Sequence, residues 1–297
     1  MARLLAPVKG KLFIHSSRKS THALDGAYAS LLRGHSLDFD DLRAYEYGDQ
    51  IRDIDWKATA RLGSAVVRRS LATRMHTVLF AVDTGLPMTA LAHDERPKKD
   101  LAILAVGALG LLSLRHGDDF TVVAGDAEGV RRRDIGRSEA ALEHALRAID
   151  ERIGSARAES DRDGLLSFIV RTIRRRMIVV VVTDDAPLTE TTERLLRRLR
   201  VQHDVLWIAL RDADPVRERE ARGEVRRDVR THWAVPGFAH GDPAIADELR
   251  RADEDARAHR DEVLRRLEIT HVELDGQDDA IDDLLVMLDR RSHVRRG

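Results

Sequence analysis

Three carboxylates stand where two apolar runs of the chain end. Asp83 closes the run TVLFAVD, and Asp184 and Asp185 close the run MIVVVVTDD. If both runs are strands of one parallel sheet, their carboxyl ends meet at the edge where open α/β sheets bind ligands. Carboxylates in that place can hold Mg²⁺, which prefers oxygen ligands. Aspartates at strand ends also serve as turn residues and helix caps, so both interpretations stay open.

The elements that would position these carboxylates are visible from about Thr77 onward. Short apolar runs alternate there with helical stretches, which is typical of βαβ units around a parallel sheet. We expect strands at 77–83, 119–125, 130–132, 177–184, 204–212 and 270–275, and helices at 96–115, 138–153, 165–176, 188–201, 242–267 and 280–290. The unbroken apolar run of 177–184 predicts a central strand that is buried on both faces. The sequence therefore predicts an α/β fold with a mostly parallel sheet and helices on both faces.

The first 76 residues have a different pattern. Their segment 42–63, LRAYEYGDQIRDIDWKATARLG, contains the turn signal Gly48-Asp49 between residues that alternate like short strands. We expect a small β-rich extension over 1–76, followed by the α/β domain over 77–297. The many opposite charges of this segment most simply form salt bridges that fix the extension onto the sheet, and an acidic docking surface for a basic partner is the alternative.

Composition excludes several classes of function. The chain has 50 Lys+Arg against 51 Asp+Glu, a net charge of −1, and no Cys. A nearly neutral chain lacks the basic surplus typical of nucleic-acid binding, and without Cys there are no disulfides, thiol nucleophiles or cysteine metal sites. The sequence also lacks the phosphate-binding, dinucleotide, zinc-protease and serine-hydrolase motifs. We therefore expect neither a nucleic-acid partner nor one of these enzyme chemistries.

No apolar stretch of the sequence is typical of a membrane span. The longest, from Leu101 to Leu114, is shorter than the roughly 20 residues that cross a bilayer. The N-terminus has no apolar run long enough for a secretory signal. We expect a cytoplasmic protein without an intrinsic membrane anchor, peripheral to the membrane only through a partner.

Three segments together resemble one bacterial family. They are LDFDDLRAYEYGDQIRDIDWKATARLG at 37–63, VDTGLPM at 82–88 and VVVVTDD at 179–185. From about residue 37 to 288 the chain resembles the domain-of-unknown-function family fifty-eight, whose members carry a von Willebrand factor A-like domain and are commonly encoded beside MoxR-type AAA+ ATPases. The resemblance implies a Rossmann-like, von Willebrand factor A-like fold and an interaction module rather than an enzyme.

The resemblance also implies a metal site. In that fold a divalent cation is typically held by an Asp-x-Ser-x-Ser loop after the first strand, a hydroxyl from a second loop and an Asp after a later strand. Asp83 matches the first Asp, Asp184 matches the last, and Ser138 could stand in the second loop. Gly85 and Pro87 replace the two loop serines and offer no side-chain oxygen. We expect a degenerate site with no required cofactor, where Mg²⁺ binds weakly at most.

The leading hypothesis is a non-enzymatic adaptor that acts with a MoxR-type AAA+ ATPase, and with other proteins, in protein assembly or maturation. The partner surface would involve the family motif, the edge around Asp83 and Asp184, or the helix at 242–267. The motif residues are Arg43, Tyr47, Gly48, Asp49, Arg52, Asp53, Asp55, Trp56, Lys57 and Arg61.

The alternative is a Mg²⁺-dependent phosphohydrolase or phosphotransferase of the haloacid-dehalogenase type. In that chemistry Asp83 would be the nucleophile and Asp184-Asp185 the acidic pair after the later strand. The reaction usually needs a second Asp two residues after the nucleophile, and Gly85 stands at that position. The missing acid disfavours this alternative.

Overall fold

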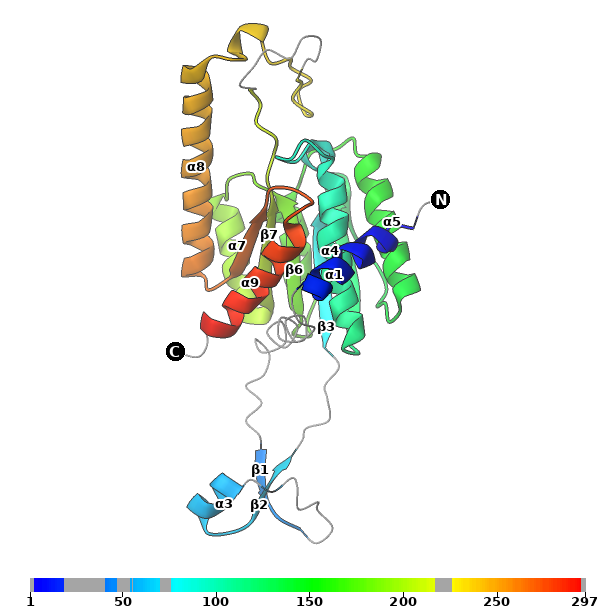
Figure 1. The fold of residues 1–297 in the computed structure, drawn as a ribbon, viewed down its shortest axis with the longest axis vertical. Helices are drawn as coiled ribbons and strands as arrows, with labels where there is room; N and C mark the ends of the chain where they lie inside the picture. The colour runs from blue at the N-terminus through cyan, green and yellow to red at the C-terminus, as the bar shows by residue number, and fades with distance from the viewer. Residues whose placement is uncertain are drawn as a thin grey trace.

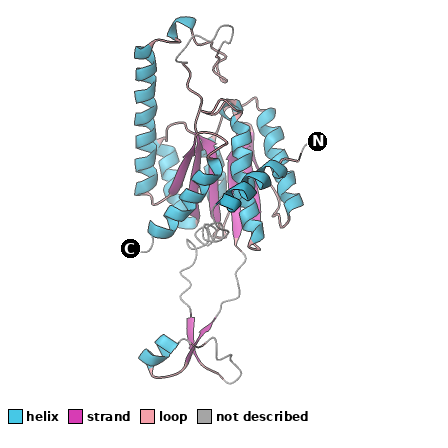
Figure 2. Ribbon diagram, viewed as in Figure 1, coloured by secondary structure: helices cyan, strands magenta, loops and turns pink. Residues whose placement is uncertain are grey.

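A six-stranded sheet forms the body of the molecule. The computed structural model describes residues 3–18, 41–46, 54, 56–69, 76–216 and 226–294. The strands are β3 (Thr77–Asp83), β4 (Asp119–Asp126), β5 (Gly129–Arg132), β6 (Ile178–Asp184), β7 (Asp204–Leu210) and β8 (Thr270–Leu274). Their order is β5-β4-β3-β6-β7-β8, and only β5 runs antiparallel to its neighbour (Figure 2). This is the order of doubly wound Rossmann-like sheets, so the predicted fold class is confirmed.

Helices cover both faces of the sheet. On one face lie α1 (Leu5–Arg18), α4 (Lys98–Arg115), α5 (Glu139–Gly154) and α9 (Ala280–Val294), and on the other lie α6 (Arg162–Thr172), α7 (Glu190–Gln202) and α8 (Pro243–Arg266) (Figure 1). Alternate residues of β3 divide between the two cores: Phe80 faces the first helical layer, and Leu79 and Ala81 face the second. All three are fully buried. Burial on both faces explains why the central strands are continuously apolar.

The predicted elements of 77–297 all occur, with ends displaced by a few residues. Side-chain caps begin two of these helices: the Ala141 N–H donates to Ser138 Oγ at 3.2 Å, and the Ala244 N–H donates to Asp242 Oδ1 at 2.9 Å. The described loops also contain two short 3₁₀ helices, η2 (Leu86–Thr89) and η3 (Gly237–Ala239). The helical and strand periods therefore located the body of the fold correctly.

The N-terminal stretch differs from the β-rich prediction. Helix α1 packs across α4, and its Leu5, Val8 and Leu12 side chains are buried in the core on that face. Its first amides are capped from another element, because the Leu4 and Leu5 N–H groups donate to the Glu143 carboxylate at 3.1 and 2.8 Å. Residues 3–18 thus belong to the main body in space.

A separate lobe carries the next part of the chain. Strands β1 (Asp41–Ala44) and β2 (Val66–Arg69) pair antiparallel, and α3 (Trp56–Leu62) lies between them in the sequence. Figure 1 shows this lobe standing off the end of the body at which β3 begins. The prediction of short strands is wrong for residues 56–62, because they form helix α3. The predicted turn at Gly48-Asp49 lies outside the described residues.

No helix among the described residues is long and apolar enough to cross a membrane.

Candidate functional site

The carboxyl ends of β3 and β6 form the switch point of the sheet. The two strands are neighbours, with Val82 paired to Val182. The chain continues from β3 towards β4 on one side and from β6 towards β7 on the other, which opens the ligand crevice of such folds. Asp83 and Asp184 end these strands, and both are buried. The Thr183 hydroxyl is 3.4 Å from Asp83 Oδ2 and 3.3 Å from Asp184 Oδ1, so the structure brings the two aspartates together.

Asp83 is held by two donors from neighbouring loops. The Gly85 N–H and the Ser160 hydroxyl each donate to Asp83 Oδ1 at 2.9 Å. The pKa of Asp83 is raised to about 6, because burial and, to a lesser extent, the charge of Asp184 outweigh the hydrogen bonds from Gly85 and Ser160 and the charge of Arg162. At neutral pH the site therefore contains a buried carboxylate that is costly to ionise.

Gly85 is required because another loop lies directly against it. A β-carbon at residue 85 would lie 2.4 Å from the backbone nitrogen of Ser160 and 2.5 Å from its Cα. The same loop is tied down by the Leu86 N–H, which donates to the Ala158 carbonyl at 2.8 Å. A serine at position 85 would collide with this backbone, so the neighbouring loop occupies the space that a side chain at residue 85 would need.

The structure corrects the placement of Ser138. This residue caps α5 beside Arg137, which pairs with Asp119 at the start of β4, so it lies at the opposite end of the sheet from Asp83. The reason is topological: β5 reverses the direction of the chain, and α5 consequently begins at the amino ends of the parallel strands. Ser160, which follows α5, supplies the hydroxyl at the carboxyl ends.

A guanidinium group lies beside the two aspartates. Arg162, the first residue of α6, has its Nη1 at 3.8 Å from Asp184 Oδ1. Its Nη1 and Nη2 donate to the carbonyls of Ala186 and Pro187 at 3.0 and 2.7 Å. Its Cζ lies 5.7 Å from the ring centroid of the buried Trp207, within cation–π range. Arg162 thus binds the loop that follows β6 and places a fixed positive charge at the switch point.

A second acidic group lies next to the first. Asp185 Oδ2 accepts the Asp212 N–H at 3.0 Å, and Asp212 forms an ion pair with the fully buried Lys98. Partial burial raises the pKa of Asp212 to about 6, opposed by Lys98 and reinforced by Asp185. As at Asp83, the negative charge is balanced by a cation of the chain itself.

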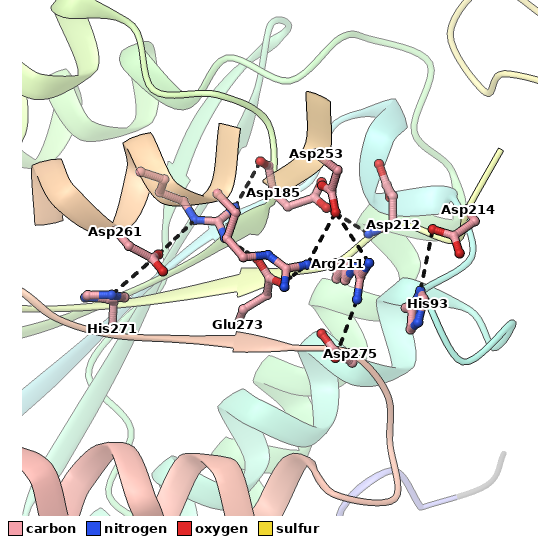
Figure 3. A network of polar contacts seen from close by, with 12 residues as sticks. His93, Asp185, Arg211, Asp212, Asp214, Asp253, Asp261, His271, Glu273 and Asp275 are labelled. Carbon is pink, nitrogen blue, oxygen red and sulfur yellow. Dashed lines mark hydrogen bonds and ion pairs between the residues drawn. The ribbon is translucent and has the colours of Figure 1, made fainter. Parts of the chain in front are cut away.

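The acidic group continues into a mixed network around β7 and β8 (Figure 3). Arg211 lies 3.4 Å from Asp253 Oδ2 and 3.7 Å from Asp275 Oδ2. His93 Nδ1 lies 3.9 Å from Asp214 Oδ1. Asp185, Asp212 and parts of α8 line a cleft of about 420 Å³ beside this network. Alternating acids and bases brace α8 against the strand ends rather than leaving one sign of charge exposed.

The donor set at the switch point does not fit a divalent cation. Within the described part of the chain, no group of three or more His, Cys, Asp or Glu side chains could hold a metal ion. Asp83, Asp184 and Ser160 offer few oxygens, Gly85 and Pro87 offer none from their side chains, and Arg162 already carries positive charge. Mg²⁺ demands near-octahedral oxygen coordination. No second acid stands at residue 85 for phosphoryl chemistry either.

The family-motif residues that the structure describes lie away from the switch point. Arg43 is in β1, where its backbone pairs with Val67, and Trp56, Lys57 and Arg61 are in α3. The Trp56 side chain is 65% exposed. The other motif residues, Tyr47, Gly48, Asp49, Arg52, Asp53 and Asp55, lie outside the described residues. The described motif residues of α3 therefore lie away from the switch point, because α3 belongs to the lobe at the other end of the body (Figure 1).

Sequence reasoning missed three groups of the site, Ser160, Arg162 and Lys98. Ser160 lay in a polar loop where spacing does not say which hydroxyl turns inward. Arg162 did carry a signal, because a cation in the first turn of a helix is disfavoured by the helix dipole and needs another reason to be there. Lys98 at the start of α4 carried the same signal.

Comparisons with known proteins place these features in context. A family model described as "Protein of unknown function DUF58" matches residues 41–227. The uncharacterized protein Rv1480 of Mycobacterium tuberculosis is 27% identical over 268 residues, which cover 89% of this chain and 81% of that protein. The conserved hypothetical protein BatB from Bacteroides thetaiotaomicron has a similar structure, with a TM-score of 0.43 and 12% identity over 73% of this chain and 98% of that chain. A von Willebrand factor type A protein from Catenulispora acidiphila has a TM-score of 0.39 and 13% identity, over 73% of this chain and 42% of that chain.

Proposed function

The chain belongs to the family described as protein of unknown function DUF58, and on that basis we propose that it is a non-enzymatic protein-interaction module acting with a MoxR-type AAA+ ATPase in protein assembly or maturation. In this proposal the chain works in the cytoplasm and reaches the membrane only through a partner. The ligand edge of its sheet is a degenerate metal site. The division of the sequence into an N-terminal extension over 1–76 and an α/β domain over 77–297 is part of the same proposal, with α1 of the extension packed onto the α/β domain.

The observation that carries this proposal is that groups of the chain itself fill the switch point. The backbone of Ser160 presses on Gly85, and Arg162 lies against Asp184. Groups of the chain itself thus fill the space beside Asp83 and Asp184, which supports a degenerate metal site. A buried, internally balanced edge favours a scaffold over a catalyst, because a catalytic site needs room for a substrate beside its reactive groups.

The lobe of β1, α3 and β2 supplies the proposed partner surface. Trp56 and Leu62 of α3 are exposed, and Tyr45 next to β1 is partly so. Tryptophan and tyrosine are the residues that most often anchor protein interfaces. Since the lobe stands off the body, these side chains are accessible to a large partner (Figure 1).

Affinity capture from the native host tests the proposal. The full chain is the bait, in buffers containing ATP, ADP or no nucleotide, and the captured proteins are identified by mass spectrometry. We expect a MoxR-type ATPase with the natural chain and at least tenfold less with Trp56→Ala. Trp233→Ala is the matched control, because Trp233 is another exposed tryptophan, located outside the lobe. Failure to recover any AAA+ ATPase in all three conditions would contradict the proposal.

A hydrolysis assay separates the interaction module from the phosphohydrolase alternative. A generic phosphate ester incubated with the purified chain and Mg²⁺ is expected to hydrolyse no faster than with Asp83→Asn. Hydrolysis that requires Mg²⁺ and disappears in Asp83→Asn would replace the interaction module with an enzyme.

A further inference from the structure

We infer that Arg162 is a tethered cation that takes the place of the divalent ion at the switch point of this fold. Its guanidinium joins the loop after β6 to the Asp184 carboxylate at the end of β6, next to Asp83 at the end of β3, so these loops assemble without metal. The inference rests on the degenerate metal site in the proposed function, but it does not depend on the ATPase partnership.

The contacts of Arg162 reach the groups that a bound ion would join. The guanidinium lies 3.8 Å from Asp184 Oδ1, and its charge also acts on Asp83. Two further donors bond the carbonyls of Ala186 and Pro187, which follow β6 directly. One planar cation thus binds a carboxylate and a loop backbone together, a task for which arginine is better suited than lysine.

A buried cation at residue 162 destabilises the fold unless nearby groups compensate its charge. The residue begins α6, where the helix dipole disfavours a cation. Its side chain is largely buried, and within the described residues the Nε atom is buried without a hydrogen-bond partner. The ring of Trp207 beneath the guanidinium and the nearby aspartates offset part of this cost. The contacts are concentrated at the tip of the side chain, on the side that faces Asp184 and the loop.

A purely mechanical role is the competing explanation. Arg162 would then only brace the loop through Ala186 and Pro187, and its removal would loosen the loop without changing the affinity of the site for ions. The two explanations separate once the arginine is gone. A vacated cation position exposes two carboxylates and the Ser160 hydroxyl to a small hard ion, whereas a lost brace leaves nothing for an ion to bind.

The experiment measures thermal unfolding of the purified full chain, with Mn²⁺ alone or EDTA. The natural chain is expected to show the same Tm in both conditions. Arg162→Ala and the milder Arg162→Gln are expected to unfold at lower temperature in EDTA, and to regain about 2–4 °C with Mn²⁺ at roughly ten times its dissociation constant. Arg171→Ala, on the exposed face of the same helix, is the matched control and is expected to behave like the natural chain.

Two further measurements test whether Mn²⁺ binds to the carboxylates that Arg162 leaves free. Combining Arg162→Gln with Asp83→Asn should abolish the Mn²⁺ response, because half of the carboxylate pair is gone. Emission from Trp207, isolated by Trp56→Phe and Trp233→Phe, should shift to the red in Arg162→Gln as water reaches the ring face. A Mn²⁺-dependent rise of Tm in the natural chain, or none in either Arg162 variant, would overturn the inference.

Discussion

Gly85 shows how one missing β-carbon shapes the ligand edge. The backbone of Ser160 occupies the space that a side chain at residue 85 would need. We expect Gly85→Ala to lower the free energy of unfolding by about 1–3 kcal/mol, since the loop has to move away from Asp83. Chemical denaturation measures this change. Gly237→Ala, where a β-carbon meets nothing within 4 Å, is the control with no comparable loss. Equal effects at the two glycines would contradict the packing described for the site.

Asp118, near the amino end of β4, gives the chain a pH-dependent stability. Its side chain is 4% exposed and accepts the His76 N–H at 2.7 Å. Burial raises the pKa of Asp118 to about 6, and the neighbouring Asp119 adds to the rise. Because the folded state binds the proton more tightly than the unfolded state, this carboxyl is harmless near pH 4. Its cost to stability develops as the pH rises through about 6.

Asp118→Asn tests that assignment. The amide oxygen still accepts the His76 N–H, but the buried charge is gone. We expect the free energy of unfolding to rise by ~1–3 kcal/mol at pH 8 and to change little at pH 4. Urea denaturation at the two pH values measures the difference. A gain of the same size at both would show that the charge of Asp118 is not the cause.

At the scale of elements, α1 depends on a cap supplied from α5. The Glu143 carboxylate accepts the Leu4 and Leu5 N–H groups and also pairs with Arg147. Burial opposes ionisation, but these hydrogen bonds prevail and lower the pKa of Glu143. An acceptor at the first turn of a helix is worth about 0.5–2 kcal/mol.

We expect Glu143→Ala to loosen α1 selectively. Amide hydrogen exchange should become about tenfold faster or more over residues 5–18, with little change in β3 and β6. Glu151→Ala, an exposed glutamate of the same helix, is the control. Uniform acceleration across the sheet would show that the cap stabilises the whole molecule rather than α1.

The elements that sequence reasoning located well are those with a strong period or a continuous apolar run. Strand β6 and helix α4 are buried nearly throughout, so their patterns are unambiguous. Helix α1 was missed because, among its described side chains, the buried stripe is only Leu5, Val8 and Leu12, and Pro7 and Gly10 disfavour a helix in the local pattern. Here tertiary packing overrides local preference: Gly107 of α4 leaves room for Val8, whose methyl group would be 3.0 Å from a β-carbon at that position.

The site was predictable only in part for a related reason. Apolar runs and the aspartates that end them fixed Asp83 and Asp184 at the switch point, because strand direction follows from the βαβ pattern. The identity of the nearby hydroxyl did not follow, since Ser138 and Ser160 lie at the two ends of α5 and only the direction of that helix decides between them. Arg162 of α6 contacts the loop after β6, and the local sequence pattern does not show that these two segments meet.

At the scale of the whole molecule, the near-zero net charge reflects local compensation. Lys98 pairs with Asp212, and Arg291 pairs with Asp204 in a buried contact. The switch point is one such balanced cluster, and the exposed aromatic lobe lies at the opposite end of the sheet (Figure 1). This separation favours a scaffold that presents the lobe to a partner while the charges at its ligand edge are balanced within the chain.

Direct titration of the purified chain with a purified MoxR-type ATPase from the native host tests the central claim most directly. Isothermal titration calorimetry in the presence of EDTA is expected to show saturable binding by the natural chain and by Trp233→Ala, weakened at least tenfold in Trp56→Ala. A tenfold loss corresponds to about 1.4 kcal/mol, within the range of an interface aromatic. The absence of binding with ATP, ADP and no nucleotide alike, or equal binding by Trp56→Ala, would contradict the account.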